Sequence, residues 1–338
     1  MSKISVLVAA YNAAQWLPEC LDSLLGQTWH DLEAVCIDDA STDATPRILA
    51  DYAARDPRVK MLTLSENHGQ AYARRQGQEL CQGDFITTLD ADDWLSTDAL
   101  AQAMDVFARH TQTDCVLLDV REVYPDGHEK PYLWHYATPQ ATPRADGSFE
   151  VMSGQQAFEA SLDWGIHGLY VARARLYREH PVDTACRYYS DDNTTRLHYW
   201  ASREVRCCAG RYYYRQLPTS TTHRVGTHRM DWMRATASMK RQMVKMKAGD
   251  KALDQNEWER WKVVVDCYGF YVAHRDVLNR DERAYCLNEI RQAWASMEPR
   301  RLKGRPTWKL GWHVHPGHWH LFRLEEETYF ALRRLLRR

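Results

Sequence analysis

The segment Thr87-Thr88-Leu89-Asp90-Ala91-Asp92-Asp93-Trp94 joins an apolar run to a group of carboxylates. The run from Phe85 to Leu89 is typical of a buried strand, and Asp90, Asp92 and Asp93 follow it directly. A strand that ends in an Asp-x-Asp pair brings negative charge to the edge of a sheet. Mg²⁺ prefers such oxygen ligands and is commonly held by one or two carboxylates together with phosphates. The segment therefore predicts a metal–diphosphate site, although a solvated acidic turn that caps the next helix stays open at this point.

The chain around this segment alternates short apolar runs with amphipathic stretches. The expected strands cover residues 4–10, 33–37, 59–64, 85–89 and 115–120. Helical spacing of apolar residues between these runs is typical of βαβ units and predicts an α/β fold with a mostly parallel sheet. Ligands of such sheets bind at the carboxyl ends of the strands, where Tyr11, Asp39, Asp90 and Asp92 arrive. Several polar side chains at one edge favour the metal–diphosphate interpretation over separate solvated turns.

The second half of the chain changes character. Residues 125–147 show little periodicity and predict a long loop that covers the site. Short helices and strands are expected after this loop, at residues 151–162, 174–180, 204–209 and 212–215. Beyond Ser220 the pattern is helical, with helices expected over residues 231–247, 255–274 and 281–297.

Composition limits the class of protein. The 338 residues carry a formal charge of −1, which gives no field that would attract nucleic acid. No apolar run is long enough for a transmembrane helix, and Met1-Ser2-Lys3 leads into a strand without the layout of a signal peptide. The nine cysteines are odd in number, lie mostly in apolar runs and form no Cys-x-x-Cys pair. We therefore expect reduced thiols and a cytoplasmic protein.

Four motifs in order resemble the family 2 glycosyltransferases, which have the GT-A (Rossmann-like) fold. They are Val6–Asn12, Cys36–Asp43, Asn67–Arg74 and Gly83–Asp93. A weaker match, Tyr212–Arg215 with Ser220–Thr222, resembles the bacterial lipopolysaccharide and capsule branch. The resemblance implies three parts: a nucleotide-sugar-binding half over residues 1–120, an acceptor-binding half over 121–225, and a helical extension over 226–338 for membrane or oligomer contact.

The resemblance also implies a donor, most often a UDP-sugar, with Mn²⁺ or Mg²⁺ as the divalent metal. Asp92 would be the direct metal ligand, and Asp90 would contact the ribose or the metal's water shell. Asp39 would accept the N3–H of uracil, which suits a group that only accepts hydrogen bonds, while Asp38 would bond nearby backbone. Tyr11 would flank the base. The implied donor-binding set is completed by Ala10, Asn12, Gly69, Arg74 and Ala91.

The acceptor half departs from the family pattern. The catalytic Glu-Asp pair is Asp191-Asp192 here, and Arg75 stands where the family usually has Asn. The resemblance implies that Asp192 is the general base of an inverting transfer, with Asp191 as a competitor for that role. The implied acceptor is a glycan or glycolipid in cell-surface polysaccharide synthesis.

Two further residues and two further segments are given weaker functional assignments. Asp93 is expected to cap a helix and His167 to be a packed or surface residue. The segment 312–320 is rich in His and Trp, and we favour a lipid-facing or interface role over a zinc site. Residues 330–338 predict a basic amphipathic helix, which either contacts anionic lipid on the cytoplasmic face of the inner membrane or is a solvated terminus. Association of the chain into a homo-oligomer is an alternative that the sequence leaves open.

Two other functions stay open alongside the transferase. A nucleotide-sugar pyrophosphorylase would need a Gly-rich loop bearing Arg and Lys where the chain has Ala9-Ala10-Tyr11-Asn12. A catalytically inactive relative that only binds nucleotide-sugar is disfavoured by the intact Asp90-x-Asp92, whereas Asp191 in place of Glu leaves it open. A processive synthase is disfavoured by the lack of transmembrane spans and of a Gln-x-x-Arg-Trp motif.

Overall fold

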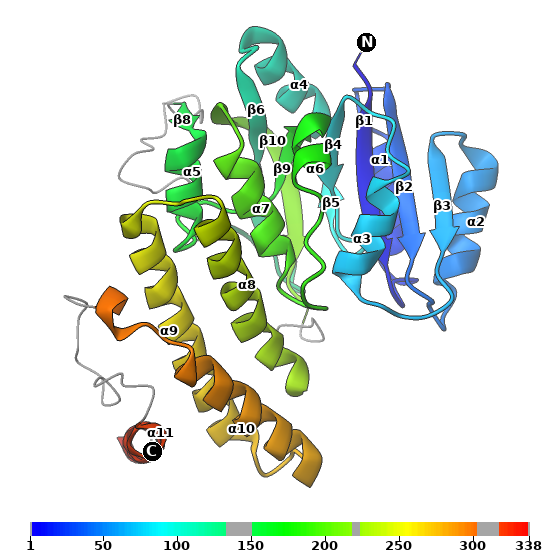
Figure 1. Ribbon diagram of the computed structural model, residues 1–338. Helices are drawn as coiled ribbons and strands as arrows, with labels where there is room; N and C mark the ends of the chain where they lie inside the picture. Colours follow the sequence, from blue (N-terminus) through cyan, green and yellow to red (C-terminus); the bar gives the residue numbers. More distant parts are fainter. Residues whose placement is uncertain (1, 133–150, 218–223, 303–317, 337–338) are drawn as a thin grey trace. The chain divides into compact units, whose positions relative to one another are not determined.

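The computed structural model describes residues 2–132, 151–217, 224–302 and 318–336. The chain forms two compact units, Met1–Ser220 and Thr221–Arg338 (Figure 1). Most of the predicted loop 125–147 and of the His- and Trp-rich segment 312–320 lies outside the described residues.

The first unit begins with four strands that alternate with helices, as the sequence predicts. The strands are β1 (Ile4–Ala10), β2 (Leu32–Asp38), β3 (Val59–Thr63) and β4 (Phe85–Thr88). They lie side by side in the order β3-β2-β1-β4, and every pair is parallel. The helices of this series are α1 (Leu17–Leu25), α2 (Thr45–Arg55), α3 (Gln70–Gln78) and α4 (Ala99–Arg109).

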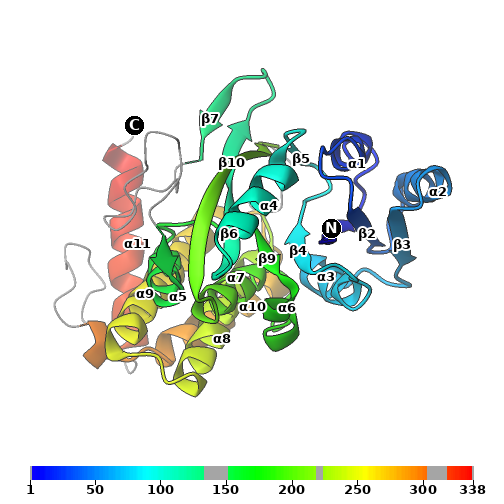
Figure 2. The ribbon, with the colours of Figure 1, turned by 90° about the horizontal axis from the view of Figure 1, so that it is seen from above.

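Alternation of side chains along the strands gives the sheet two covered faces. Val6 and Val8 belong to the core that also contains apolar residues of α1, α2 and α4. Figure 2 shows these three helices on one face of the sheet and α3 on the other. A Cβ added to Gly77 of α3 would lie 2.8 Å from side-chain atoms of Leu7 and Ile37. Helix α3 therefore lies close against the second face because glycine leaves room for the sheet.

The sheet then continues in a way that the sequence pattern does not reveal. Strand β9 (Tyr170–Arg173) is inserted antiparallel between β4 and β6 (Thr113–Val123), and β10 (Glu204–Arg215) lies parallel to β6. The sequence pattern predicts two separate pieces, 204–209 and 212–215, whereas they form one strand with an irregular register between Cys207 and Arg211. Short strand β5 (Trp94–Leu95) pairs antiparallel with the end of β10. The end of β10 therefore reaches the acidic turn after β4.

The remaining elements of this unit are short. Strands β7 (Glu129–Pro131) and β8 (Met152–Ser153) were not predicted, and they extend β6 and β10 by antiparallel pairing. The helices are α5 (Gly154–Ser161), α6 (Ala174–Glu179) and α7 (Asp191–Trp200). Helix α5 starts at a capping box formed by Ser153 and Gln156, which explains its sharp beginning.

The second unit is helical, as predicted. Its elements are η1 (Thr227–Met230), α8 (Asp231–Lys245), α9 (Asp250–His274), α10 (Arg280–Ala295), η2 (Pro299–Leu302) and α11 (Trp319–Leu336). Its core gathers large side chains such as Trp261, Tyr268, Trp294 and Phe322. Helix α11 begins at Trp319, so the terminal helix is longer than the predicted 330–338. Within the described parts of the chain, no helix is both long and apolar enough to cross a membrane.

The nine cysteines, all of which lie in described parts of the chain, are free thiols. Eight of them are buried, and the ninth, Cys81, is half-buried. The burial of eight of the nine agrees with the expectation that these thiols lie in apolar surroundings.

Candidate active site

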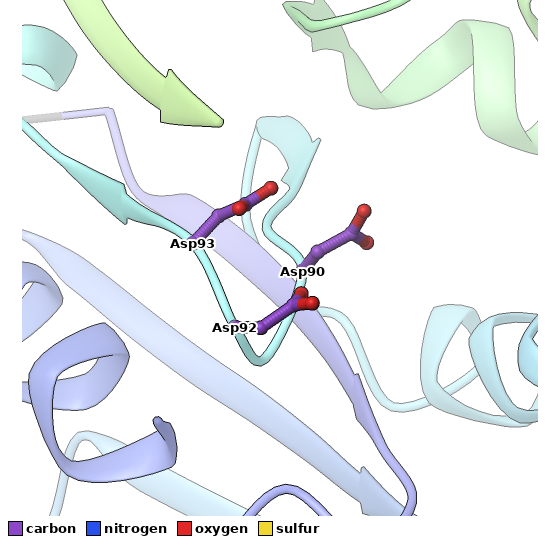
Figure 3. Close-up of side chains that lie close together, drawn as sticks. All are labelled: Asp90, Asp92 and Asp93. Carbon is purple, nitrogen blue, oxygen red and sulfur yellow. The ribbon is translucent and has the colours of Figure 1, made fainter. Parts of the chain in front are cut away.

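Strand β4 delivers three carboxylates to one turn at the carboxyl edge of the sheet. The turn is closed by the backbone N–H of Asp93, which donates to the carbonyl of Asp90 at 3.0 Å. One carboxylate oxygen from each of Asp90, Asp92 and Asp93 lies within 4.8 Å of the others. Figure 3 shows the three side chains projecting from this single turn.

Asp93 is a structural member of this group. It is 1% exposed, and its Oδ2 accepts the hydroxyl of Tyr212 at 2.8 Å while its Oδ1 accepts the backbone N–H of Arg215 at 2.7 Å. The expectation that Asp93 caps the next helix is wrong, because β5 follows it directly and α4 begins at Ala99. Burial and the neighbouring aspartates raise the pKa of Asp93.

Arg215, at the end of β10, holds the same turn from another side. Its Nε donates to the carbonyl of Asp92 at 2.8 Å, and its Nη2 lies 2.5 Å from Oε2 of Glu19. The guanidinium carbon lies 4.3 Å from the ring centre of Trp16 and 4.4 Å from that of Trp94. In the sequence, Tyr212–Arg215 stands out only through a family resemblance, which implies no role for these residues. The structure places Tyr212 and Arg215 in direct contact with the acidic turn.

The carboxylates of Asp90 and Asp92 are only half-buried. Burial and the charge of Asp90 raise the pKa of Asp92 to about 6, against the opposing influence of Arg215 and Arg74. Asp90 accepts a hydrogen bond from Nε2 of Gln70 at 2.9 Å and pairs with Nη2 of Arg74. Oxygen atoms are the ligands that Mg²⁺ and Mn²⁺ prefer. Carboxylate oxygens of Asp90 and Asp92 within 4.8 Å of each other are compatible with ligation of one divalent cation.

Arg74 connects the acidic turn to the other half of the sheet. Its side chain comes from α3 and is 7% exposed. Nη2 pairs with Asp90, and Nη1 lies 3.5 Å from Oδ2 of Asp191. Burial disfavours the charge, but Asp90 and Asp191 outweigh burial and raise the pKa of Arg74. By contrast, Arg75 lies on the half-exposed side of α3, where it pairs with Glu79 at 3.6 Å.

Asp191 and Asp192 form the first turn of α7. The preceding Ser190 does not cap this helix, because its hydroxyl donates to the carbonyl of Cys186 at 2.9 Å. Burial and the charge of Asp191 raise the pKa of Asp192 to about 8, although Arg196 opposes the shift. The fold thus brings the predicted acceptor-side pair to the same site as the predicted metal ligands, with Arg74 between them.

The loops after β1 and β2 form the other end of the candidate site. Tyr11 is 49% exposed at the end of β1. Asn12 adopts a positive φ of 50°, and its side-chain carbonyl accepts the backbone N–H of Thr42 at 2.8 Å. The carbonyl of Ala10 accepts the N–H of Asp39 at 2.9 Å. One bond between backbone groups and one between the Asn12 side chain and backbone therefore link the two loops, and the ring of Tyr11 stays accessible beside them.

Asp39 is 2% exposed and organises the turn before α3. Its Oδ1 accepts the N–H of His68 at 2.9 Å, and its Oδ2 accepts that of Gly69 at 2.7 Å. The sequence predicts that Asp38 bonds nearby backbone, and Asp38 does accept the N–H of Ser41 at 3.2 Å. Asp39 carries the same kind of role for a turn that lies far along the chain.

Gly69 needs to be glycine for two reasons. Its φ is +92°, and an added Cβ would lie 2.5 Å from Cγ of Arg187. The segment before α7 therefore approaches the backbone of this turn closely. His167 is 2% exposed, and its Nδ1 accepts the N–H of Leu169 at 3.1 Å, in agreement with a packed histidine.

Comparison with known proteins agrees with this geometry. The sequence profile described as "Glycosyl transferase family 2" matches residues 5–183, which is more than half of the chain. The chondroitin synthase of Escherichia coli is 36% identical over 133 residues, covering 39% of this chain and 19% of that protein. The poly(ribitol-phosphate) beta-glucosyltransferase of Bacillus spizizenii is 30% identical over 164 residues, covering 47% of this chain and 25% of that protein. The chain thus spans a quarter or less of the length of these two relatives.

Among solved structures, S. aureus TarS 1–349 in complex with UDP-GlcNAc superimposes with a TM-score of 0.68 and 18% identity, covering 97% of this chain and 91% of that one. This likeness shows the fold, a mostly parallel GT-A-type sheet followed by helices. The chain belongs to glycosyl transferase family 2. The profile ends before α7, so Asp191 and Asp192 lie outside the matched residues.

Proposed function

We propose that the protein transfers a single sugar, with inversion, from a UDP-sugar to a glycan or glycolipid acceptor in cell-surface polysaccharide synthesis. The observation that carries this proposal is the bridge made by Arg74. One buried guanidinium contacts Asp90 of the acidic turn and Asp191 of the acceptor-side pair. A transfer between two bound substrates requires donor and acceptor groups within one site, because fixed orientation supplies much of the reduction in the barrier.

The donor end is assigned from the loops after β1 and β2. Tyr11 offers an exposed aromatic ring for the base, and Asp39 uses one lone pair of each oxygen for backbone bonds. A carboxylate has about four such sites, so it can still accept the N3–H of uracil. Ala10, Asn12 and Gly69 shape this end through backbone geometry, and Ala91 spaces the two aspartates of the turn. The fold shared with a protein solved with UDP-GlcNAc supports a UDP-sugar as donor.

The diphosphate end is assigned to the acidic turn and Arg74. Asp92 and Asp90 would hold Mn²⁺ or Mg²⁺, which when bound supplies positive charge to the leaving diphosphate. Asp93 is assigned to support of the turn instead, because its carboxylate ties the turn to Tyr212 and Arg215 of β10.

Asp192 is assigned as the general base and Asp191 as its neighbour. Asp191 is held in the ion pair with Arg74, whereas Asp192 has a pKa of about 8 caused by burial and by Asp191. A base whose pKa lies near the operating pH takes a proton from an acceptor hydroxyl more effectively than an ordinary carboxylate. This division of roles favours Asp192.

Residues 1–120 would thus be the donor half and 121–225 the acceptor half, with 226–338 as the extension. Helix α11 exposes Leu321, Leu324 and Leu332, which lie on one side of the helix at helical spacing. With the arginines of the C-terminal sequence, this face would make a peripheral contact with anionic lipid on the cytoplasmic face of the inner membrane. Flotation with anionic liposomes, comparing the full chain with a chain lacking residues 328–338, tests this contact, and equal flotation of both would exclude it.

A donor screen tests the proposed function. Thermal unfolding is followed with a panel of UDP-sugars, GDP-sugars and UDP, each with and without Mn²⁺. We expect one UDP-sugar with Mn²⁺ to raise the unfolding midpoint, and Asp92→Asn to remove the Mn²⁺-dependent part of the rise. A rise that is the same without metal would contradict the role of Asp92, and a response only to GDP-sugars would contradict the UDP donor.

A further inference from the structure

We infer that Arg215, supported by Tyr212, is the positioning residue that sets the metal-binding geometry of the acidic turn. Neither residue touches the reacting atoms in this assignment. Both act on the backbone and on Asp93, and so determine where the carboxylate of Asp92 stands. The inference rests on the proposed function, because it takes Asp92 as the metal ligand.

The turn is held from β10 by four hydrogen bonds. Tyr212 donates its hydroxyl to Asp93 and accepts the backbone N–H of Asp90 at 3.1 Å. Arg215 donates its backbone N–H to Asp93 and its Nε to the carbonyl of Asp92 at 2.8 Å. The bonds reach the first, third and fourth residues of the turn, so β10 fixes its backbone along the whole length.

The guanidinium of Arg215 is itself fixed. Its carbon lies over the rings of both Trp16 and Trp94, and Trp94 stacks in turn on Tyr213 with ring centres 5.1 Å apart. Glu19 binds the far end of the guanidinium at 2.5 Å. Two ring contacts and the bond to Glu19 restrict the orientation of this planar cation, whose Nε donates to the carbonyl of Asp92. Lysine lacks both the plane and the fork of donors, so it cannot replace these contacts.

This arrangement predicts an effect on metal affinity rather than on nucleotide affinity. Partners that orient metal ligands typically change metal affinity about 10–100-fold when they are removed. The contacts of Arg215 described above are with Asp92, Glu19, Trp16 and Trp94. Asp39 and Tyr11, the residues assigned to the uracil base, are not among them. Loss of Arg215 should therefore weaken the contribution of the metal and leave metal-free UDP binding unchanged.

The test is calorimetric titration of UDP into the full chain with and without Mn²⁺. The measured quantity is the ratio of the two affinities, which reports the metal's contribution. We expect this ratio to fall about tenfold in Arg215→Lys. It should fall to one in Asp92→Asn and stay at the wild-type value in Arg211→Lys. Arg211 is a matched control because it lies on the same strand, exposed, 3.7 Å from Asp119.

The outcomes separate the inference from the proposed function. If Mn²⁺ does not strengthen UDP binding to the wild-type chain, the metal role in the proposed function fails. If it does and Arg215→Lys shows the same ratio, the inference fails alone. Equal losses with and without Mn²⁺ would mean that Arg215 binds the nucleotide itself, which also overturns the inference. Should Arg215→Lys fail to fold by circular dichroism, Tyr212→Phe takes its place, with a smaller fall in the same ratio expected.

Discussion

Nη1 of Arg74 lies 3.5 Å from Oδ2 of Asp191, while Nη2 of the same guanidinium pairs with Asp90. A cation from α3 thus joins carboxylates that follow β4 and begin α7. Removing one partner of a buried pair leaves uncompensated charge, whereas a solvent-exposed pair contributes little. Because Arg74 itself is 7% exposed, the site depends on this residue for both charge balance and alignment.

Replacement of Arg74 by lysine keeps the charge but removes the two-ended reach. We expect Arg74→Lys to lower kcat at least tenfold, since one ammonium cannot contact Asp90 and Asp191 together. Steady-state rates with the donor found in the screen measure this effect. Arg75→Lys is the control, because Arg75 pairs with Glu79 on the half-exposed side of the same helix. Equal rates for both variants would remove Arg74 from the site.

The ionised carboxylate of Asp192 should lower the free energy of unfolding, because it is buried beside Asp191. A carboxyl whose folded pKa is raised to about 8 binds its proton in the folded state while the unfolded chain has already lost it. Stability that depends on this group is therefore greatest below the ordinary carboxyl pKa and falls as pH rises toward 8. Asp192→Asn removes the dependence, so it should raise the unfolding midpoint more at pH 8 than at pH 5.

The same titration predicts the pH dependence of the reaction. The basic form of Asp192 increases as pH rises through about 8, so the transfer rate should rise over that range. Asp191→Asn removes one of the causes of the raised pKa, and the rise should then shift to lower pH. A rise at the same pH in this variant would show that Asp191 does not act on the base.

Substitution of Asp39 tests whether its carboxylate stabilises the buried turn that precedes α3. In Asp39→Asn one of the two accepting oxygens becomes an NH2 group, which cannot accept the N–H of His68 or Gly69 that faces it. Leaving one buried N–H without a partner costs about 1–3 kcal/mol, which urea unfolding can measure. We expect weaker UDP binding as well. Asp38→Asn provides the comparison, because Asp38 accepts one N–H from its own loop.

Gly69 and Arg187 allow a double substitution. Gly69→Ala should destabilise the chain, since the new Cβ meets the side chain of Arg187 and φ is +92°. Arg187→Ala in the same chain removes the clash but leaves the backbone strain. The double variant should therefore recover part of the lost unfolding free energy. Full recovery would show that the backbone tolerates alanine, and no recovery would show that the contact is irrelevant.

The local pattern of the sequence predicts the parallel half of this fold well. Strands β1 to β4 are apolar runs with polar ends, and their order places Asp39 and Asp90 at one edge without knowledge of distant contacts. The insertion of β9 depends on pairing between strands far apart in the chain, which periodicity does not encode. The same limit applies to Tyr212 and Arg215, whose role is visible only once β10 meets the turn.

Asp93 shows how a local rule fails at a site. An aspartate after an apolar run and before a helical pattern is typical of a helix N-cap, so the local sequence predicts that Asp93 caps the next helix. Its true partners lie on β10, more than a hundred residues on, and they bury the carboxylate completely. By contrast, the assignment of Asp191 and Asp192 depends on family resemblance, and only the fold brings Asp191 next to Arg74.

The most direct test of the central claim is release of UDP from the UDP-sugar selected by the screen, with Mn²⁺ and purified acceptor glycan. The wild-type chain should release UDP in step with product of inverted configuration. Asp192→Asn should bind the donor with unchanged affinity and lose at least a hundredfold in rate, as expected for removal of a general base. Transfer at the wild-type rate by Asp192→Asn, or retained configuration in the product, would contradict the account.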